Sequence, residues 1–281
     1  MASTLFSPFD LGSLRLDNRI VVSPMCQYSA VDGSATDWHM IHLGTLALSG
    51  AGLLMVEATA VEAVGRITPG CLGLYSDDNE AALARVLDAL RGHSDMPIGI
   101  QLAHAGRKGS SRPPWAGGQL VPVEEGGWRP LAPSPVPIHA GEPAPEMLDE
   151  AGIDRIREAF VASTKRAVAL GLDAAQLHCA HGYLLHEFLS PISNRRDDRY
   201  GGSLENRARL TFEIVDGIRA ACGPDFSLGL RLSPERFGMD LGEVREVARR
   251  VMAEGRIDYL DMSLWDVFKT PVDEAYQDRR L

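Results

Sequence analysis

The sequence predicts an α/β fold of the TIM (β/α)8-barrel type. Short apolar segments alternate with amphipathic helical segments, and this order requires parallel strands joined by helical crossovers. The apolar segments lack the polar alternation of a half-exposed strand, as expected for strands that are buried on both faces. Each segment ends at polar residues, and the carboxyl ends of barrel strands meet at one mouth. Neither G-x-G-x-x-G nor G-x-x-x-x-G-K-[ST] occurs, so an open nucleotide-binding sheet lacks its usual support.

Six strands are expected from these apolar segments. They are residues 18–26, 53–56, 97–102, 174–177, 227–232 and 259–264. The first ends at Pro24, because proline has no N–H group for a central ladder. The fifth carries Arg231 inside an apolar run, where an unpaired charge is costly and a partner is therefore expected.

Five helices are expected between and after these strands. They are residues 38–49, a helix starting at Asp77, 149–170, 204–221, and a helix through Val244 and Val251. Asp77 lies three residues before Glu80, a spacing that resembles a capping box. Glycines follow most of these segments, as expected for helix termination.

Residues 1–281 are expected to form a single barrel domain with a Pro/Gly-rich lid at about 109–145. This connection is longer than usual, and its two tryptophans, Trp115 and Trp128, favour a packed lid over a low-complexity linker. A closed barrel has eight βα units, whereas about six are evident and residues 270–281 show no seventh strand. Either the C-terminal units are missing, or the barrel is open, or a partner completes it.

Composition excludes several classes of protein. The 281 residues are 45% hydrophobic with a net charge of -10, which argues against non-specific nucleic-acid binding. The N-terminus lacks the pattern of a signal peptide, and no apolar run reaches the roughly 18 residues of a membrane helix. The four cysteines are far apart without C-x-x-C, so neither a disulfide framework nor a structural zinc site is expected. We therefore expect a reduced, cytoplasmic protein without nucleic-acid or membrane partners.

The stretch 174–210 carries the most informative polar residues. His178, His181 and Tyr183 follow a buried strand and precede a polar loop. The two histidines admit three interpretations: structural residues bonded to the backbone, metal ligands, or donors to an oxygen that gains negative charge during reaction. A third metal ligand is not evident, and His186-Glu187 lacks the H-E-x-x-H pattern. An unperturbed tyrosine, with a pKa of about 10, is protonated at neutral pH and can act as an acid.

Motifs along the whole chain carry a family resemblance. The longest is HCAHGYLLHEFLSPISNRRDDRYGGSLENR, and the others are LDNRIVVSPMCQYS, VEATAV with GRIT, and QLAHAGRK. Together they resemble the old yellow enzyme family of FMN-dependent NAD(P)H:flavin oxidoreductases, or ene-reductases. The S-P-M-C-x-Y version is similar to the branch of xenobiotic reductases and thermophilic-type enzymes.

The resemblance implies that FMN lies across the barrel mouth and that NAD(P)H is the reductant. The implied flavin-binding residues are Ser23, Pro24, Met25, Cys26, Ala58, Gln101 and Arg231. Cys26 would tune the flavin potential, and Arg231 would stabilise the reduced anion. Tyr28 would orient the substrate.

The implied reaction reduces a small-molecule activated alkene, an α,β-unsaturated carbonyl compound. His178 and His181 would bind its carbonyl oxygen while hydride moves from the flavin to the β-carbon, and Tyr183 or water would protonate the α-carbon. The family also suggests a homo-oligomer.

Two rival hypotheses stay open, and the first follows from a departure from the family. In related barrels the cofactor phosphate binds at the loops after strands seven and eight, and this sequence shows neither. Weak or absent FMN binding would follow, and the chain would then be a flavin-free remnant that acts as a binding protein. The second rival is a metal-dependent lyase or hydrolase on the same barrel.

Overall fold

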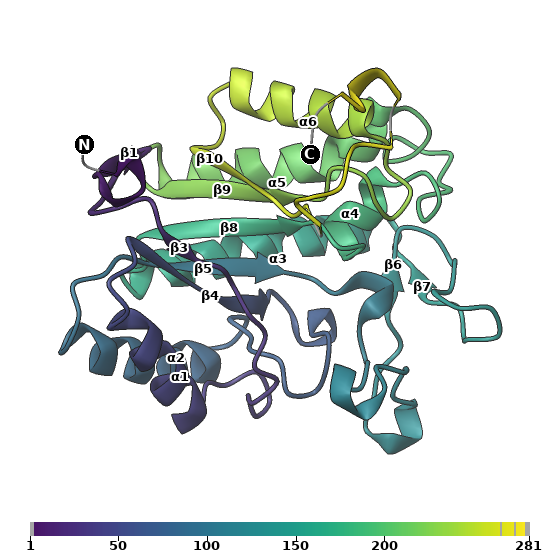
Figure 1. The fold of residues 1–281 in the computed structure, drawn as a ribbon. Helices are drawn as coiled ribbons and strands as arrows, with labels where there is room; N and C mark the ends of the chain where they lie inside the picture. The colour runs from purple at the N-terminus through teal and green to yellow at the C-terminus, as the bar shows by residue number, and fades with distance from the viewer. Residues whose placement is uncertain (1–2, 265, 273, 279–281) are drawn as a thin grey trace.

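The computed structural model describes residues 3–264, 266–272 and 274–278. At its centre is a parallel sheet of six strands in the spatial order β10-β9-β8-β5-β4-β3 (Figure 1). The strands are β3 (Val21–Val22), β4 (Leu53–Ala60), β5 (Ile98–Ala103), β8 (Ala174–Cys179), β9 (Ser227–Leu232) and β10 (Tyr259–Met262). Because consecutive strands are neighbours and all run in one direction, the curled sheet confirms the expected α/β fold of the TIM type.

Helices cover the outer face of the sheet (Figure 1). They are α1 (Asp37–Ala47), α2 (Asp77–Arg91), α3 (Glu150–Ala169), α5 (Leu204–Cys222) and α6 (Leu241–Ala253). All five expected helices are therefore present. The cap of α2 differs from the expectation: the Ser76 hydroxyl accepts the Asn79 N–H at 3.2 Å, because Ser76 has extended backbone angles whereas Asp77 already lies in the helix.

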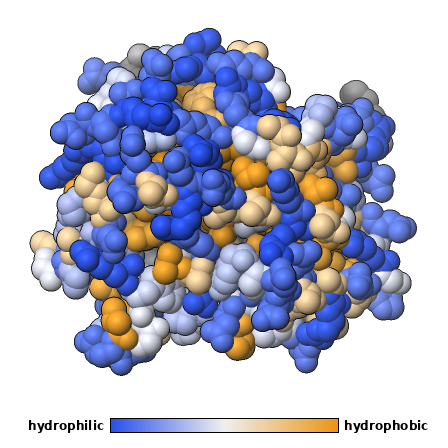
Figure 2. Space-filling view, turned by 180° about the vertical axis from the view of Figure 1, so that it is seen from behind, coloured by the Kyte–Doolittle hydropathy of each residue, from blue (hydrophilic) through white to orange (hydrophobic). Residues whose placement is uncertain are grey.

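The main hydrophobic core lies between the sheet and these helices. Seen from behind, the outer surface is mostly hydrophilic, with hydrophobic residues showing between the polar ones (Figure 2). A second, smaller cluster of Leu16, Leu53 and Met55 fills the inner side of the sheet. Gly229 makes room there, since a Cβ atom at this position would lie 2.1 Å from the Tyr259 ring. No helix among the described residues has the length and apolar content needed to cross a membrane.

An antiparallel hairpin that the sequence analysis missed lies at the amino ends of the strands. It consists of β1 (Phe9–Leu11) and β2 (Leu14–Leu16). The Ser227 hydroxyl donates to the Leu11 carbonyl at 3.4 Å, and Leu16 packs in the inner cluster. The tight turn brings Gly12 against Asp258, where a Cβ atom would approach within 2.6 Å. The hairpin therefore contacts β4, β9 and the residue before β10.

Four predicted strands need correction. The strand expected at 18–26 pairs only over Val21–Val22 and is partly exposed, because Asn18 forms a local turn by accepting the Ile20 N–H at 3.0 Å. The strands expected at 53–56 and 174–177 continue to Ala60 and Cys179. The last strand ends at Met262 rather than at residue 264. A six-residue helix, α4 (Leu184–Leu189), was also missed, because it is buried on all sides and therefore has no amphipathic pattern.

The connection between β5 and α3 contains short elements of its own. Three 3-10 helices, Gly106–Lys108, Pro114–Ala116 and Val123–Glu125, precede two short strands, β6 (Leu131–Ala132) and β7 (Glu146–Met147). The two strands pair in parallel. Trp128 is partly buried, and its Nε1 donates to the Val64 carbonyl at 2.9 Å.

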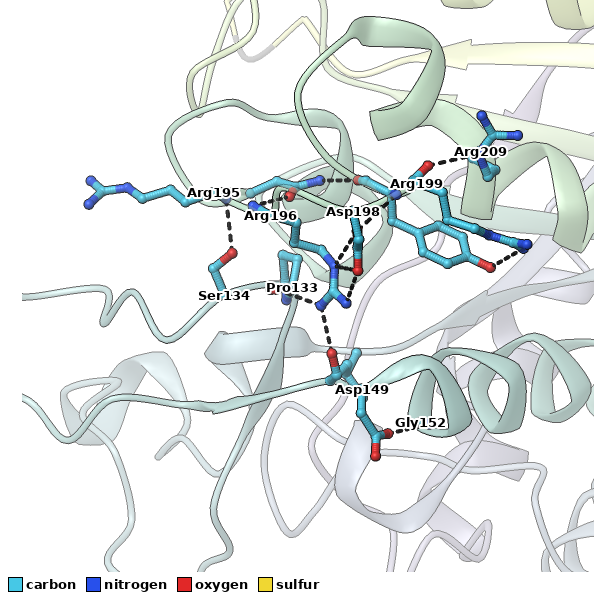
Figure 3. A network of polar contacts seen from close by, with 12 residues as sticks. Pro133, Ser134, Asp149, Gly152, Arg195, Arg196, Asp198, Arg199 and Arg209 are labelled. Atoms are coloured by element: carbon cyan, nitrogen blue, oxygen red, sulfur yellow. Dashed lines mark hydrogen bonds and ion pairs between the residues drawn. The ribbon is translucent and has the colours of Figure 1, made fainter.

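A buried arginine attaches this connection to the loop after α4 (Figure 3). Arg196 Nη1 donates to the carbonyls of Pro133 at 3.0 Å and Leu148 at 2.6 Å. The same guanidinium pairs with Asp198, with Nε 3.0 Å from both carboxylate oxygens. The neighbouring Arg195 side chain points away from the network (Figure 3). Arg196 is thus a structural residue that orders two loops.

Candidate active site

Three aromatic rings meet at the carboxyl end of β8. The ring centroid of His178 lies 5.0 Å from that of His181 and 4.8 Å from that of Tyr183. The centroids of His181 and Tyr183 are 6.4 Å apart. His178 is in the strand, whereas Tyr183 is the residue before α4. The sequence analysis grouped these residues by their spacing, and the structure brings all three together.

His178 is held as a neutral hydrogen-bond donor. Its side chain is almost fully buried, at 3% exposure, and its Nδ1 accepts the Ala180 N–H at 3.3 Å. In a neutral imidazole the other nitrogen then carries the proton. Burial lowers the pKa of His178 well below its usual value, and the nearby His181 and Arg231 lower it further. His178 Nε2–H is therefore available to an acceptor without a charge on the ring.

His181 is fixed by contacts with three other elements. Its backbone is left-handed, with φ of 60°, and its N–H donates to the Ser233 hydroxyl at 3.1 Å. Its carbonyl accepts Lys108 Nζ at 2.6 Å, and its Nε2 lies 2.5 Å from Ser263 Oγ. Burial, followed by the charge of Arg231, lowers the pKa of His181 to about 4. This imidazole is also neutral near pH 7.

Lys108 packs its ammonium group against the same cluster. Its Nζ lies 5.4 Å from the Tyr183 ring centroid and 4.7 Å from that of Phe237. The turn that carries Lys108 is held by Glu187 of α4, whose carboxylate oxygens accept the Arg107 N–H at 3.0 and 3.3 Å. Burial raises the pKa of Glu187 to about 8. Burial likewise raises the pKa of Tyr183, so its hydroxyl keeps its proton at neutral pH.

The loop after β3 brings Cys26 and Tyr28 to this side of the sheet. Burial raises the pKa of Cys26, and Cys71 and Glu57 add to the effect. The pKa of Tyr183 is raised by the same Cys26 group and by Tyr28, which places the loop beside the ring cluster. Of the neighbouring residues, Pro24 is partly buried, whereas Ser23 and Met25 are exposed. Trp115 stands edge-on to Tyr28, with centroids 5.3 Å apart.

A chain of polar side chains crosses the inner side of the sheet below the rings. Gln101 Nε2 donates to Gln176 Oε1 at 2.6 Å, and Gln176 Nε2 donates to Asp261 Oδ2 at 3.2 Å. Arg231 Nε lies 3.4 Å from the same Asp261 oxygen. Ala58 is opposite Gln101 in the ladder. Ala58, Gln101 and Arg231, predicted separately, therefore belong to one inner surface.

This inner surface has the properties required to bind a flavin ring. Arg231 Nε is buried, faces the Asp261 carboxylate at 3.4 Å and forms no hydrogen bond among the described residues, so its N–H can still serve an anionic or carbonyl edge of a ligand. A cavity of about 280 Å³ adjoins it, with Ser23 and Pro24 on one side and Gln176 and Asp261 on the other. The remaining lining is mostly apolar and includes Leu11 of the amino-terminal hairpin, so the cavity extends along the inner side of the sheet from this polar surface towards the amino ends of the strands.

The sequence analysis missed Gln176, Asp261 and Ser263, which contact the predicted residues. Gln176 and Asp261 interrupt apolar strands as Arg231 does, and this was the available signal. Ser263 gave none, because a single serine after a strand is common. The metal interpretation of the histidines gains no support, since no group of three or more potential ligands is arranged for a metal within the described ranges.

Comparison with known proteins identifies relatives of this chain. Residues 4–277 match the model of the NADH:flavin oxidoreductase / NADH oxidase family. An NADPH dehydrogenase of Geobacillus thermodenitrificans is 39% identical over 97% of this chain and 76% of its own length. An NADH:flavin oxidoreductase of Gibberella zeae is 46% identical over 78% of this chain. The match covers 54% of the length of that relative.

Solved structures give the same result. Morphinone reductase superposes with a TM-score of 0.81 at 30% identity, over 95% of this chain and 73% of that chain. A structure of morphinone reductase in complex with tetrahydroNAD superposes with a TM-score of 0.79, also at 30% identity, over 93% of this chain and 74% of that one.

Proposed function

The chain belongs to the NADH:flavin oxidoreductase / NADH oxidase family, and on that premise we propose that it is an ene-reductase. It passes hydride from NAD(P)H through FMN to the activated C=C bond of an α,β-unsaturated carbonyl compound. The observation that carries this proposal is the cluster of His178, His181 and Tyr183, three neutral hydrogen-bonding rings with centroids 4.8 to 6.4 Å apart. The cluster stands next to a buried arginine nitrogen without a hydrogen-bond partner among the described residues.

FMN would supply the hydride transfer when bound, and residues of this chain would hold it. Arg231 would donate to the electron-rich pyrimidine edge of the ring, and Gln101 would hydrogen-bond the same edge. Ala58 would contact the ring. The segment of Ser23, Pro24, Met25 and Cys26 would lie along it, and Tyr28 would orient the substrate.

The histidines act on the substrate oxygen. His178 donates from Nε2, because Nδ1 already accepts a backbone N–H. His181 supplies the second donor, and the substrate oxygen competes with Ser263 for it. Donors aimed at an oxygen that gains charge are typically worth about 2.7–4 kcal/mol each. Tyr183 then protonates the α-carbon, since its raised pKa keeps the proton on the phenol until that step.

Separate measurement of the two half-reactions tests this assignment. We expect His178→Ala to slow alkene reduction about 10²–10³-fold while the rate of FMN reduction by NADPH changes by less than about fivefold. Equal losses in both steps would contradict the role of His178. A colourless purified protein that takes up no FMN yet unfolds cooperatively would instead support the binding-protein alternative, and loss of activity with a chelator would support the metal-dependent one.

We further propose that residues 1–281 form one barrel domain whose six parallel strands are six of the eight units of a closed barrel, with 109–145 as a lid. Two observations support this: the cavity between β3 and β10 and the 73% coverage of morphinone reductase. Urea unfolding tests the single domain: one cooperative transition, with the same midpoint by tryptophan fluorescence and far-UV circular dichroism, is expected. Two separate transitions would refute it.

Exposed apolar residues support the proposal of a homo-oligomer. Trp38, Ile41 and Leu48 lie along one side of α1 and its end and are 48, 62 and 67% exposed. We propose that this side pairs with a second copy of the chain in the cytoplasm. Light scattering after size-exclusion chromatography tests it: Ile41→Lys should shift an oligomer towards monomer, and a monomeric wild-type protein would refute the proposal.

A further inference from the structure

A β-bulge in β4 places a carboxylate behind the loop that carries Cys26 and Tyr28. In the ladder with β5, Val56 is opposite Ile100 and Ala58 is opposite Gln101, so Glu57 is the extra residue. A bulge inserts one extra residue into a strand and so shifts the in-and-out alternation of the residues that follow it. Here it allows Ala58 to face the inner surface and leaves Glu57 buried, with 3% exposure.

Each carboxylate oxygen of Glu57 faces a nitrogen atom of another element. Oε2 accepts the Gln27 backbone N–H at 3.0 Å. Oε1 lies 3.3 Å from His39 Nε2, an ion-pair distance, and His39 is only 1% exposed. His39 Nδ1 accepts the Thr36 N–H at 2.9 Å, so a neutral His39 carries its proton on Nε2, on the side of Glu57. The carboxylate therefore accepts one hydrogen bond from the loop and lies against a buried imidazole of α1 whose Nε2 forms no hydrogen bond among the described residues.

The loop that Glu57 contacts contains Cys26, Gln27 and Tyr28, and its backbone is strained at Tyr28. Gln27 lies between Cys26 and Tyr28, and Tyr28 has a left-handed backbone with φ of 52°. Such a conformation is unfavourable for a non-glycine residue and persists only when its surroundings enforce it. Trp38 Nε1 also donates to Gln27 Oε1 at 3.0 Å. The loop is therefore anchored through Gln27 on both its backbone and its side chain.

The charge of Glu57 also acts on the thiol. Besides burial, Cys71 and Glu57 raise the pKa of Cys26. Cys26 in turn raises the pKa of Tyr28 and of Tyr183. Burial is the main cause of the raised pKa of Cys26, and the negative Glu57 opposes formation of a second anion nearby.

We propose that Glu57, oriented by His39, is a positioning residue that holds Cys26 and Tyr28 in place through the Gln27 amide. The inference rests on the proposed function in one respect, the assignment of Cys26 to the flavin and of Tyr28 to the substrate. The contacts themselves do not depend on it. A secondary consequence is that Cys26 remains a protonated thiol rather than a reactive thiolate.

The test is the alkylation rate of Cys26 by iodoacetamide in the flavin-free full-length chain, followed by mass spectrometry across pH 7–10. Glu57→Gln is nearly isosteric, but its amide has one acceptor oxygen for two N–H donors. We expect Cys26 to be alkylated about tenfold faster at pH 8 in this variant. A wild-type alkylation rate in Glu57→Gln would overturn the proposal.

The chain offers a matched control at the end of the same strand. Glu62 forms a similar pair, with Oε1 2.9 Å from His104 Nε2, and its other oxygen accepts Arg155 Nε at 3.1 Å. Glu62→Gln should leave Cys26 alkylation unchanged. A similar acceleration in both variants would show general loosening and would overturn the proposal. Because the readout needs no flavin, a wild-type protein that fails to reduce FMN would refute the proposed function without deciding this inference.

Discussion

Arg196→Met should destabilise the protein strongly, although Arg196 lies in the polar network away from the ring cluster. The substitution keeps an unbranched apolar stem of similar reach and removes every donor. Two carbonyls, those of Pro133 and Leu148, lose the Nη1 donor that they share. Because the Arg196 side chain is only 3% exposed, little water can take its place.

The size of the effect follows from these contacts. A buried acceptor left without a partner costs about 1–3 kcal/mol, so two carbonyls together cost about 2–6 kcal/mol. The Asp198 side chain is 32% exposed, so water replaces much of its lost partner and the ion pair adds at most about 1 kcal/mol. We expect the free energy of unfolding to fall by about 2–7 kcal/mol.

Urea unfolding, combined with hydrogen exchange, measures both the global and the local consequence. Residues 131–148 should exchange faster in Arg196→Met, because the arginine ties this segment to the loop after α4. Arg195→Met is the control: its backbone N–H, which donates to Ser134 Oγ at 2.9 Å, is unchanged, and its side chain is exposed. This control should stay within about 0.5 kcal/mol of wild type. An Arg196→Met loss below about 1 kcal/mol, with unchanged exchange, would refute the reasoning.

Three further predictions concern the interior, the rings and the connection that carries Trp115. Gly229→Ala should cost about 1–3 kcal/mol, because the new Cβ atom would overlap the Tyr259 ring; a neutral change in the urea midpoint would contradict the packing. The pKa of His181 is lowered from 6.5 to about 4, so the unfolded state binds more protons between these values and stability should fall on acidification from pH 6.5 to 4. His181→Gln should flatten that part of the stability curve, and an unaltered slope would refute it. Trp115 is 75% exposed and stands edge-on to Tyr28, so it should contribute about 0.5–1.5 kcal/mol to the binding of bulky aryl enones. Trp115→Ala should therefore raise the KM for bulky aryl enones about two- to tenfold and leave the KM for a small enone unchanged. Equal effects on both substrates would count against a contact between Trp115 and the aryl group.

The elements that the sequence predicted well are those in which local pattern and tertiary environment agree. The strand expected at 227–232 matches Ser227–Leu232, because an apolar run between a Gly-Pro stop and a polar end has few alternatives. The helix expected at 149–170 begins after Asp149, whose side chain accepts the Gly152 N–H at 2.7 Å. Both boundaries depend on neighbouring residues in the chain.

The missed elements depend on distant contacts. The hairpin β1–β2 is only three residues per strand, and its inner residue Leu16 is buried by Leu53 and Met55. The bulge at Glu57 has no local signal, because it is defined by the register of β4 against β5. Helix α4 has no polar face to generate periodicity.

The candidate site divides in the same way. The cluster of His178, His181 and Tyr183 could be predicted because a short turn after a strand keeps these residues close. Their contacts to Ser263 and Lys108 could not, since these residues come from the ends of other strands. Sequence spacing therefore identifies which chemical groups gather at the mouth, whereas strand register decides which of them touch.

The hairpin β1–β2 can pack in its final place only late in translation. Its partners Asp258 and Ser227 lie more than 200 positions later in the chain, so a ribosome exposes the first sixteen residues long before their docking surface exists. During that interval the apolar side chains of the segment remain without their final neighbours. The inner face of the sheet is therefore sealed at the base only after translation has passed β10, and chaperone contact with the nascent chain should concentrate on this early segment until then.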